Sequence, residues 1–282
     1  MSKKKKPRPL PETLGLPRVG VDSHAHLDLD DFPPEELDEL LRQASRAGVG
    51  AVGNVFLGPD AYDAAHERLA AGGEGWPELF FLLAVHPNNT GDCDAGTMER
   101  MRARFQADPR LRAVGETGLD YYWKRVPEAV QQEAFRQHLD LARGLGLPVV
   151  IHSRDADPDT LAVLEAEGFA GLPVLWHCFG AGPEFAERLL ANGWHLSIPG
   201  PVTYKGNDAL AEAVRIIPLE RLLVETDCPF LTPEPWRGKR NHPALAAFTA
   251  AKVAEIKGLD PAEVWRAAGE NARAFFGLPK TT

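Results

Sequence analysis

Cysteine is scarce in this sequence. Cys93, Cys178 and Cys228 are the only three among 282 residues, and no two of them form a CxxC pair. This number and spacing indicate neither a disulfide framework nor a sulfur-ligated zinc site. We therefore expect the three thiols to act as small buried apolar groups.

Long apolar runs are also absent. No run approaches the ~20 residues that a membrane-spanning helix needs. The N-terminus, Met1–Leu10, carries positive charge but lacks the apolar segment that follows such charges in a secretory signal. With 44% hydrophobic and 25% charged residues, the composition is that of an ordinary globular protein. The expected location is the cytoplasm, with no membrane partner.

Positive charge is limited too. The net charge is −9, whereas a protein that coats nucleic acid over its whole surface relies on excess positive charge to release counterions. Any contact with a polyanion must therefore be local. Two basic clusters qualify, Lys3–Arg8 near the N-terminus and Arg237–Arg240 in the last third of the chain. No requirement for a protein partner can be inferred.

What the sequence does contain is an alternation of short β-like apolar runs with longer amphipathic stretches, which is typical of βαβ units around a parallel sheet. The eight strand candidates are Val19–Ser23, Ala51–Leu57, Leu79–Val85, Leu111–Gly115, Pro148–Ile151, Pro173–Trp176, His195–Ile198 and Arg221–Val224. The clearest helical stretches are Pro34–Ala47, Pro127–Leu145, Glu184–Asn192, His242–Lys257 and a last helix that opens at Asp260.

Eight such units predict an α/β fold, a single-domain (β/α)₈ TIM barrel over residues 19–279. A flexible, basic and proline-rich leader over residues 1–18 is expected to precede it. The rival architecture is an open doubly wound sheet, but no G-x-G-x-x-G motif follows the first strand to support it. We expect the last helix to pack outside the barrel.

Metal-type residues stand at the predicted ends of several strands. His24 and His26 flank Ala25, and the two-residue period of an extended backbone puts both imidazoles on one face. Taken alone, this pair is equally compatible with two hydrogen-bonded histidines, because short motifs mislead. Four more strands end in a potential ligand: Glu116, His152, His177 and Asp227.

The carboxyl ends of barrel strands converge on one rim, where barrel enzymes hold their active sites. A purely structural role would require five independent coincidences, so we interpret all six residues as metal ligands. Their number exceeds the three or four protein ligands of a mononuclear site, which favours two divalent ions that share Glu116. Nitrogen and oxygen donors suit Zn²⁺ or Mn²⁺ better than Mg²⁺ and leave the metal's identity open.

Six segments together resemble, in order and spacing, the TatD-related deoxyribonuclease family of metal-dependent hydrolases. They are SHAHLD (23–28), GETGLDY (115–121), IHSRDA (151–156), HCF (177–179), ETD (225–227) and RGKRN (237–241). The resemblance runs from about Val21 to Phe276. It implies a (β/α)₈ fold, a dinuclear site and hydrolysis of phosphodiesters in DNA, often as a 3′-to-5′ exonuclease on single strands or 3′ ends.

Residue by residue, the resemblance assigns three ligands to one ion, two to the other and one carboxylate to both. The first set is His24, His26 and Asp227, the second is His152 and His177, and the shared carboxylate is Glu116. Many members carry a histidine in place of Asn88 and a glutamate in place of His242. These two departures bear on substrate contacts more than on the metal ligands.

Other roles follow from phosphodiester chemistry. Asp227 is expected to accept the proton of the attacking water while Glu116 bridges the ions. The residues expected to bind the strand are Arg154, Lys239, Arg240 and Tyr121, the last with Tyr122 and Trp123 as a stacking surface. The alternative to strand binding at residues 237–240 is a solvated loop. The alternative at residues 121–123 is a hydrophobic lid over the barrel. The residues expected to orient the ligands are His86 and Glu225.

Two other functions stay open on the sequence. A hydrolase of the same fold with another substrate, such as the ester of aminoacyl-tRNA, would use the same metals, because they serve acyl and phosphoryl centres alike. A non-catalytic nucleic-acid-binding protein would keep the metals for stability, but the sequence lacks the broad basic surface expected of one.

Overall fold

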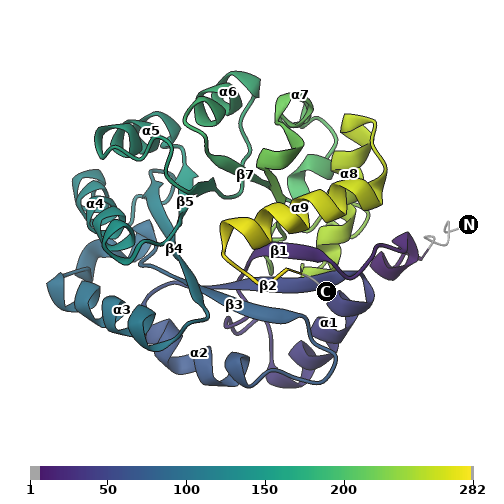
Figure 1. Cartoon of the computed structure of the whole chain (residues 1–282), viewed down its shortest axis with the longest axis horizontal. Coiled ribbons are helices and arrows are strands. Elements are labelled where there is room, and N and C mark those ends of the chain that lie inside the picture. The colour runs from purple at the N-terminus through teal and green to yellow at the C-terminus, as the bar shows by residue number, and fades with distance from the viewer. Residues whose placement is uncertain (1–6, 281–282) are drawn as a thin grey trace, which may run out of the picture.

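A computed structural model describes residues 7–280 and confirms the predicted barrel (Figure 1). One sheet holds eight strands in the order β1 to β8, and each adjacent pair is parallel. The strands are β1 (Gly20–Ala25), β2 (Val49–Phe56), β3 (Glu78–Leu83), β4 (Leu111–Asp120), β5 (Val149–Arg154), β6 (Val174–Trp176), β7 (His195–Ile198) and β8 (Leu222–Val224).

Helices alternate with the strands and surround the sheet (Figure 1). The α-helices are α1 (Pro34–Arg46), α2 (Pro59–Ala71), α3 (Ala95–Ala107), α4 (Glu128–Leu145), α5 (Asp157–Ala166), α6 (Pro183–Ala191), α7 (Asp208–Ile216), α8 (Ala246–Lys257) and α9 (Pro261–Phe275). The 3₁₀ helices are η1 (Pro11–Leu14), η2 (Pro87–Asp92), η3 (Gly200–Thr203), η4 (Leu219–Arg221) and η5 (Pro243–Leu245).

The two ends of the sheet meet next to the predicted ligands. Ala25 forms a parallel bridge with Cys228. The N–H of His26 donates to the Cys228 carbonyl at 2.9 Å, and the N–H of Asp227 donates to the His24 carbonyl at 2.9 Å. Closure of the barrel therefore also brings together the ligands that β1 and β8 carry.

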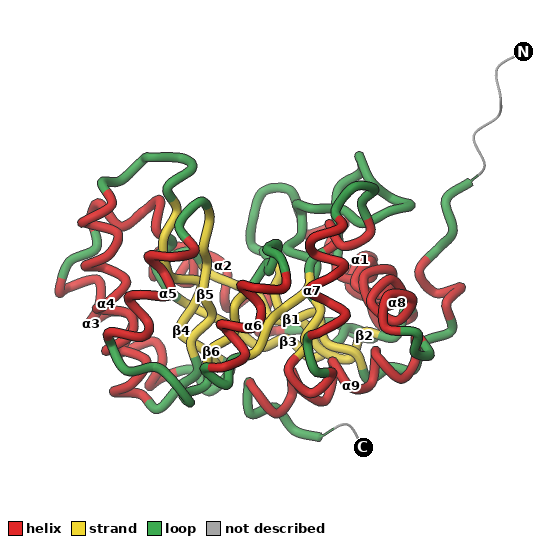
Figure 2. The backbone as a smooth tube through the Cα atoms, turned by 90° about the horizontal axis from the view of Figure 1, so that it is seen from above, coloured by secondary structure: helices red, strands yellow, loops and turns green. Residues whose placement is uncertain are grey.

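β4 and β5 extend three or more residues beyond their predicted carboxyl ends. β4 continues to Asp120 instead of ending near Gly115, and β5 continues to Arg154 instead of Ile151. The two strands pair over this extra length, up to the partners Asp120 and Arg154, so Glu116 and His152 lie inside strands rather than at their ends. Figure 2 shows β4 and β5 extending toward the loops at one end of the barrel.

Apolar side chains from alternate strand positions fill the barrel interior. Their cluster includes Val21, Ala51, Phe80, Leu82, Ala113, Val150, Leu175 and Leu223. Phe275 and Phe276, at the end of α9, belong to the same cluster. α9 also packs on β1 and β8, where the Trp265 ring lies so close to Gly20 that a Cβ there would come within 1.9 Å of it. The helix thus packs outside the barrel, as predicted, and its last turn also closes one end of the interior.

Part of the predicted flexible leader packs on the barrel. Pro11–Leu14 forms η1, and the indole N–H of Trp236 donates to the Pro9 carbonyl at 2.8 Å. The guanidinium of Arg8 donates to the Pro235 carbonyl at 2.9 Å. The lysine run at residues 3–6 lies outside the described residues.

The helix predicted to begin at His242 begins later. His242 has extended backbone angles (φ −158°, ψ 161°), and η5 separates it from α8, which starts at Ala246. The Asn241 side-chain oxygen accepts the His242 N–H at 2.9 Å, so this donor is satisfied by a side chain rather than by a helix.

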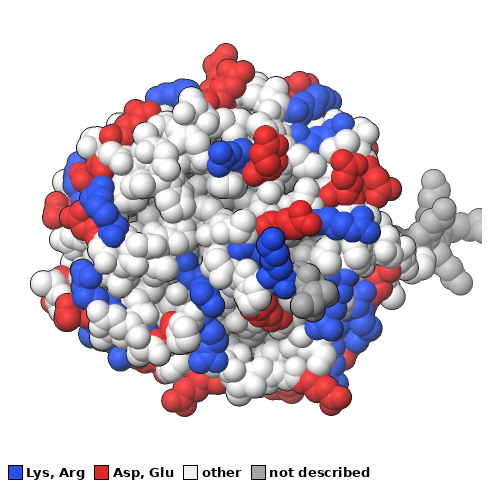
Figure 3. Space-filling model, in the orientation of Figure 1, with Lys and Arg blue, Asp and Glu red and all other residues white. Residues whose placement is uncertain are grey.

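Two of the three thiols are less buried than predicted, and side chains of both charges mix on the face shown in Figure 3. Among residues 7–280, no helix combines the length and apolar character needed to cross a membrane. Cys228 is buried as predicted, whereas Cys93 and Cys178 are half-buried, and all three are free. On the face that carries α9, basic and acidic side chains are interspersed, and the residues coloured there form no continuous basic surface (Figure 3).

Candidate metal centre

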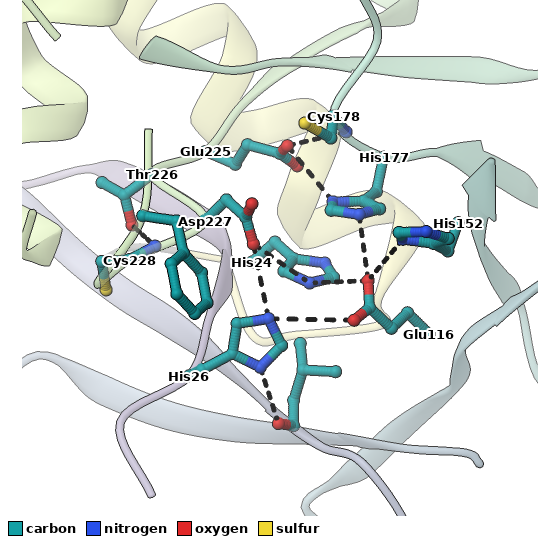
Figure 4. Close-up of polar contacts among 12 residues, drawn as sticks. His24, His26, Glu116, His152, His177, Cys178, Glu225, Thr226, Asp227 and Cys228 are labelled. Carbon is teal, nitrogen blue, oxygen red and sulfur yellow. Dashed lines mark hydrogen bonds and ion pairs between the residues drawn. The ribbon is translucent and has the colours of Figure 1, made fainter. Parts of the chain in front are cut away.

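Glu116 lies at the centre of the predicted ligands (Figure 4). Its Oε2 atom lies 3.0 Å from His177 Nε2, 3.4 Å from His24 Nε2 and 3.5 Å from His152 Nδ1. Its Oε1 atom lies 3.9 Å from His26 Nε2. One buried carboxylate thus approaches all four of the imidazoles predicted as ligands.

Asp227 completes the group. Its Oδ1 atom lies 3.4 Å from His26 Nε2 and 3.9 Å from His24 Nε2. The residue follows β8 in the left-handed backbone region, with φ 53°. Such a conformation is uncommon for a residue other than glycine, and functional sites concentrate backbone strain of this kind. The predicted grouping of His24, His26 and Asp227 is therefore present in space.

The donor set fits metal ions. Three groups of side chains place their ligand atoms within 4.8 Å of one another. The groups are His24 with His26 and Glu116, His24 with His177 and Asp227, and His86 with Glu116 and His152. Both ring nitrogens of His24 are buried without a hydrogen-bond partner among the described residues. Buried polar atoms normally have a partner, so this ring is available to a ligand.

Three of the imidazoles share a further feature, which is that the ring nitrogen turned away from the centre faces an oxygen. The pairs are His26 Nδ1 with the Val55 carbonyl at 3.2 Å, His177 Nδ1 with Glu225 Oε1 at 3.3 Å, and His152 Nε2 with Asp120 Oδ2 at 3.3 Å. An oxygen acceptor keeps the proton of a neutral ring on that outer nitrogen. The inner nitrogen then presents a lone pair to a cation.

His86 is arranged in the opposite way. Its Nδ1 accepts the N–H of Asn88 at 3.1 Å, and its Nε2 lies 3.8 Å from Glu116 Oε1. Burial, together with the nearby His152, lowers the pKa of His86 to about 3. The ring is therefore neutral and carries its proton on Nε2, so it presents a hydrogen-bond donor to the centre.

Asp120 is a site residue that the sequence prediction missed. Beside its contact with His152, its Oδ2 accepts from the Asn88 side chain at 2.9 Å. Its Oδ1 accepts the N–H groups of Tyr122 at 3.0 Å and Trp123 at 3.1 Å. Burial alone would raise the pKa of Asp120, but the hydrogen bonds from His152 and Trp123 lower it to about 2. No local pattern marked it, because the strand was predicted to end near Gly115, before residues 117–120.

Two more carboxylates lie behind the ligands. Glu225 is fully buried, accepts the Cys178 N–H at 2.7 Å and places Oε1 3.3 Å from His177 Nδ1, while its orienting role stays a prediction. Asp22, which the prediction missed, accepts the Thr226 hydroxyl at 2.6 Å and the Thr226 N–H at 2.8 Å. Burial raises the pKa of Asp22 to about 8. Both contacts fix the segment that leads into Asp227.

The electrostatics of the centre favour positive charge. Burial alone would raise the pKa of Glu116, but the surrounding imidazoles, first that of His177, hold it well below its usual value. Burial alone would lower the pKa of His26, but the hydrogen bond to Asp227 and the charge of Glu116 raise it to about 9. Protons bind tightly between these carboxylates, and a divalent cation can take their place and balance the same negative charge.

Arg154 and Tyr121, two of the residues predicted to bind a DNA strand, have different surroundings. The Arg154 guanidinium lies 3.9 Å from the centroid of the Tyr122 ring, which is half exposed. The Tyr121 hydroxyl donates to Asp159 at 3.0 Å and accepts from the Gln132 side chain at 3.0 Å. Tyr122 and Trp123 are thus the more exposed part of this aromatic segment.

Lys239 and Arg240 lie in the loop that follows β8, and both are exposed. The Arg240 guanidinium forms an ion pair with Glu36 and donates to the Asp31 carbonyl at 2.5 Å. It also lies 5.4 Å from the Phe32 ring. Any phosphate group that binds Arg240 would therefore compete with the carboxylate of Glu36 in α1.

Comparison with known proteins identifies a family. The family model described as TatD related DNase matches residues 21–277. An uncharacterized metal-dependent hydrolase TatD of Mycobacterium tuberculosis is 38% identical over 265 residues, which cover 92% of this chain and 98% of the relative. A protein of Citrobacter rodentium named 3′-5′ ssDNA/RNA exonuclease TatD is 33% identical over 248 residues, which cover 86% of this chain and 92% of that relative.

A solved structure gives the same result for the fold. The crystal structure of YjjV, a TatD homolog from Escherichia coli, superimposes with a TM-score of 0.84 at 26% identity and covers 93% of this chain and 99% of that one. The family match spans nearly all of the barrel, and the histidines and carboxylates that carry the sequence resemblance meet in one centre. The chain therefore belongs to the TatD related DNase family of metal-dependent hydrolases.

Proposed function

We propose that this protein is a two-ion phosphodiesterase that removes nucleotides from the 3′ ends of single-stranded DNA. The observation that carries the proposal is the position of Glu116 among four imidazoles, with Asp227 beside two of them. The relative named 3′-5′ ssDNA/RNA exonuclease TatD supports the choice of substrate and polarity.

The ligands divide into two sets around Glu116. His24, His26 and Asp227 would hold one ion, and His152 and His177 would hold the other. When two ions are bound in this way, they activate water and stabilise charge on the attacking and departing oxygens of a phosphodiester. The N and O donor set suits Zn²⁺ or Mn²⁺.

Asp227 is the proposed proton acceptor for the attacking water. Burial alone would raise the pKa of this carboxyl, but its hydrogen bond with His26 and the charge of His177 lower it. Asp227 is therefore ionised at neutral pH, as a proton acceptor must be. Its fixed backbone conformation holds the carboxylate at the centre without further reorganisation.

His86 and Arg154 are proposed to hold the phosphate. The Nε2–H group of His86 points to the centre, where it can donate to a phosphoryl oxygen. Arg154 follows His152 on β5 and brings a guanidinium to the same rim, which suits a phosphodiester anion. Lys239 and Arg240 would contact phosphates farther along the strand.

A substrate panel tests this proposal. The metal-reconstituted protein is given single-stranded DNA labelled at its 5′ end, the same DNA as a duplex, an aminoacyl-tRNA and a small carboxylic ester. We expect the single strand to shorten progressively from its 3′ end, and Asp227→Asn to abolish the shortening. Rapid cleavage of either ester without shortening of the strand would overturn the proposal in favour of an esterase.

A further inference from the structure

Exposed aromatic side chains gather on the metal side of the barrel. Among residues 7–280, the large apolar side chains that are well exposed include three aromatic ones, Tyr122 at 50%, Trp123 at 51% and Phe230 at 51%. The other members of that group, such as Leu172 and Ile216, are aliphatic. All three aromatic residues lie in loops that follow ligand-bearing strands, β4 and β8.

These two loops flank the metal centre. Because β4 and β8 are four strands apart in a closed ring of eight, they stand on opposite sides of the barrel. Both loops leave the carboxyl ends of their strands, which form the rim that carries Glu116 and Asp227. The loops that carry the aromatic side chains therefore lie on two sides of the centre.

Phe230 has a fixed place beside the ligands of the first ion. Its ring centroid lies 6.3 Å from that of His26. Its N–H donates to the Asp227 carbonyl at 3.0 Å, and its carbonyl accepts from the Asn241 side chain at 2.6 Å. The backbone is thus held at both polar groups while half of the side chain stays in contact with solvent.

Tyr122 and Trp123 are tied to the ligands of the second ion. Both of their N–H groups are held by Asp120, whose other oxygen faces His152. The two rings are perpendicular, at 89°, with centroids 5.1 Å apart. The pair therefore keeps a defined position relative to the metal centre, although both rings are half exposed.

Cationic groups accompany this aromatic pair. Arg154 lies against one face of Tyr122, and the Arg125 guanidinium lies 5.3 Å from the centroid of the Trp123 ring. Arg125 and Lys124 also line a cavity of about 510 Å³ next to the loop. Aromatic faces beside guanidinium and ammonium groups are the combination that binds the bases and phosphates of an unpaired strand.

We infer that Phe230 and the Tyr122–Trp123 pair stack unpaired bases of single-stranded DNA on the two sides of the metal centre. The inference rests on the proposed function and explains its substrate class. Aromatic rings stack on the faces of bases whatever the sequence. In a duplex, neighbouring base pairs cover those faces. Phe230 and the Tyr122–Trp123 pair, here called the aromatic clamp, should therefore favour an unpaired strand.

The test combines protein variants with a strand that lacks bases. Phe230→Leu and the double variant Tyr122→Leu/Trp123→Leu are compared with wild type and with Leu172→Ala, an exposed apolar residue in the turn before β6, at the other end of the barrel. Substrates are a 5′-labelled single strand and the same strand with abasic residues at its 3′ end. A strand with 2-aminopurine at that end reports stacking through fluorescence quenching.

We expect each aromatic variant to raise KM for the normal strand about 5- to 100-fold, to leave kcat within about twofold and to weaken the quenching. Leu172→Ala should match wild type. On the abasic strand, the variants and wild type should share the same raised KM, because the stacking partner is already missing. Circular dichroism and metal content verify that the variants are folded and loaded.

Two results would count against the inference, and they differ. If wild type shortens the strand but the variants treat normal and abasic strands as wild type does, the aromatic clamp is wrong and the proposed function stands. If wild type with both metals neither binds nor shortens any strand, the proposed function itself fails and the clamp fails with it.

Discussion

The Nε2 atom of His177 lies 3.0 Å from Oε2 of Glu116. The other nitrogen of the same ring faces Glu225, so one imidazole stands between two buried carboxylates. Although burial alone would lower the pKa of His177, the two carboxylates raise it well above its usual value. A cation bound between His177 and Glu116 replaces a proton there, and metal binding should therefore release protons.

Replacement of Asp227 by asparagine should lower kcat by about 10²- to 10⁴-fold with little change in KM, because the shape is kept and the proton acceptor is lost. Steady-state kinetics on single-stranded DNA measure the effect. Metal analysis is the control, since Asp227 is also a proposed ligand. A variant that retains both ions and turns over at the wild-type rate would rule out Asp227 as the acceptor.

Asp120→Asn should weaken metal binding by about 10- to 100-fold, because the carboxylate that holds the outer nitrogen of His152 is removed. Asparagine still accepts the N–H groups of the following loop, so the loop should stay in place. Calorimetric titration with Zn²⁺ measures the change. Asp159→Asn is the matched control, because Asp159 accepts the Tyr121 hydroxyl on the same rim and contacts no proposed ligand. Equal affinities in all three proteins would contradict the role of Asp120.

Acid should destabilise the fold partly through His138. This buried residue accepts the Val85 N–H on Nε2 at 3.0 Å, and burial lowers its pKa from 6.5 to about 4. Between pH 6.5 and 4 the unfolded chain binds a proton that the folded chain does not. The contribution of His138 to stability is therefore fully present above pH 6.5 and is lost as the pH falls through 4.

The expected loss from this one group is about 3 kcal/mol in the free energy of unfolding. Urea unfolding of wild type and His138→Gln at several pH values between 7 and 4 measures it, since glutamine does not titrate. The variant should lose less free energy of unfolding over this range than wild type. Parallel curves for the two proteins would show that His138 has no such effect.

Lys239→Gln should weaken strand binding to a similar extent for all sequences and flatten the dependence of log K on log salt by about 0.7, one phosphate contact. Arg240→Gln should have a smaller effect, because its guanidinium must first leave Glu36. Binding is measured at several salt concentrations in an Asp227→Asn background. An unchanged salt slope for both variants would mean that this segment is only a solvated loop.

The strands, and the convergence of the six candidate ligands, could be predicted because both depend on local patterns. Each central strand is an apolar run, and the residues near its carboxyl end follow within a few positions. The carboxyl end of β4 could not be predicted, because the residues from Thr117 to Asp120 resemble a loop until they pair with β5. That pairing depends on closure of the whole barrel, which no local pattern reports.

The supporting groups were harder to predict than the ligands. Asp120 supports His152 only because Asn88 and β5 reach it from other parts of the chain. The difference between the engaged hydroxyl of Tyr121 and the half-exposed Tyr122 likewise depends on Asp159 in α5. Such contacts are set by tertiary packing, so sequence spacing alone does not specify them.

The two-ion centre is tested most directly by a metal titration of chelated protein, with activity on single-stranded DNA and metal content followed together. Chelation should abolish activity and leave the circular dichroism of the barrel unchanged. The six proposed ligands, Glu116 among them, predict that activity returns fully only as the second equivalent of Zn²⁺ or Mn²⁺ binds. Full activity with one equivalent, or with none, would contradict the two-ion centre.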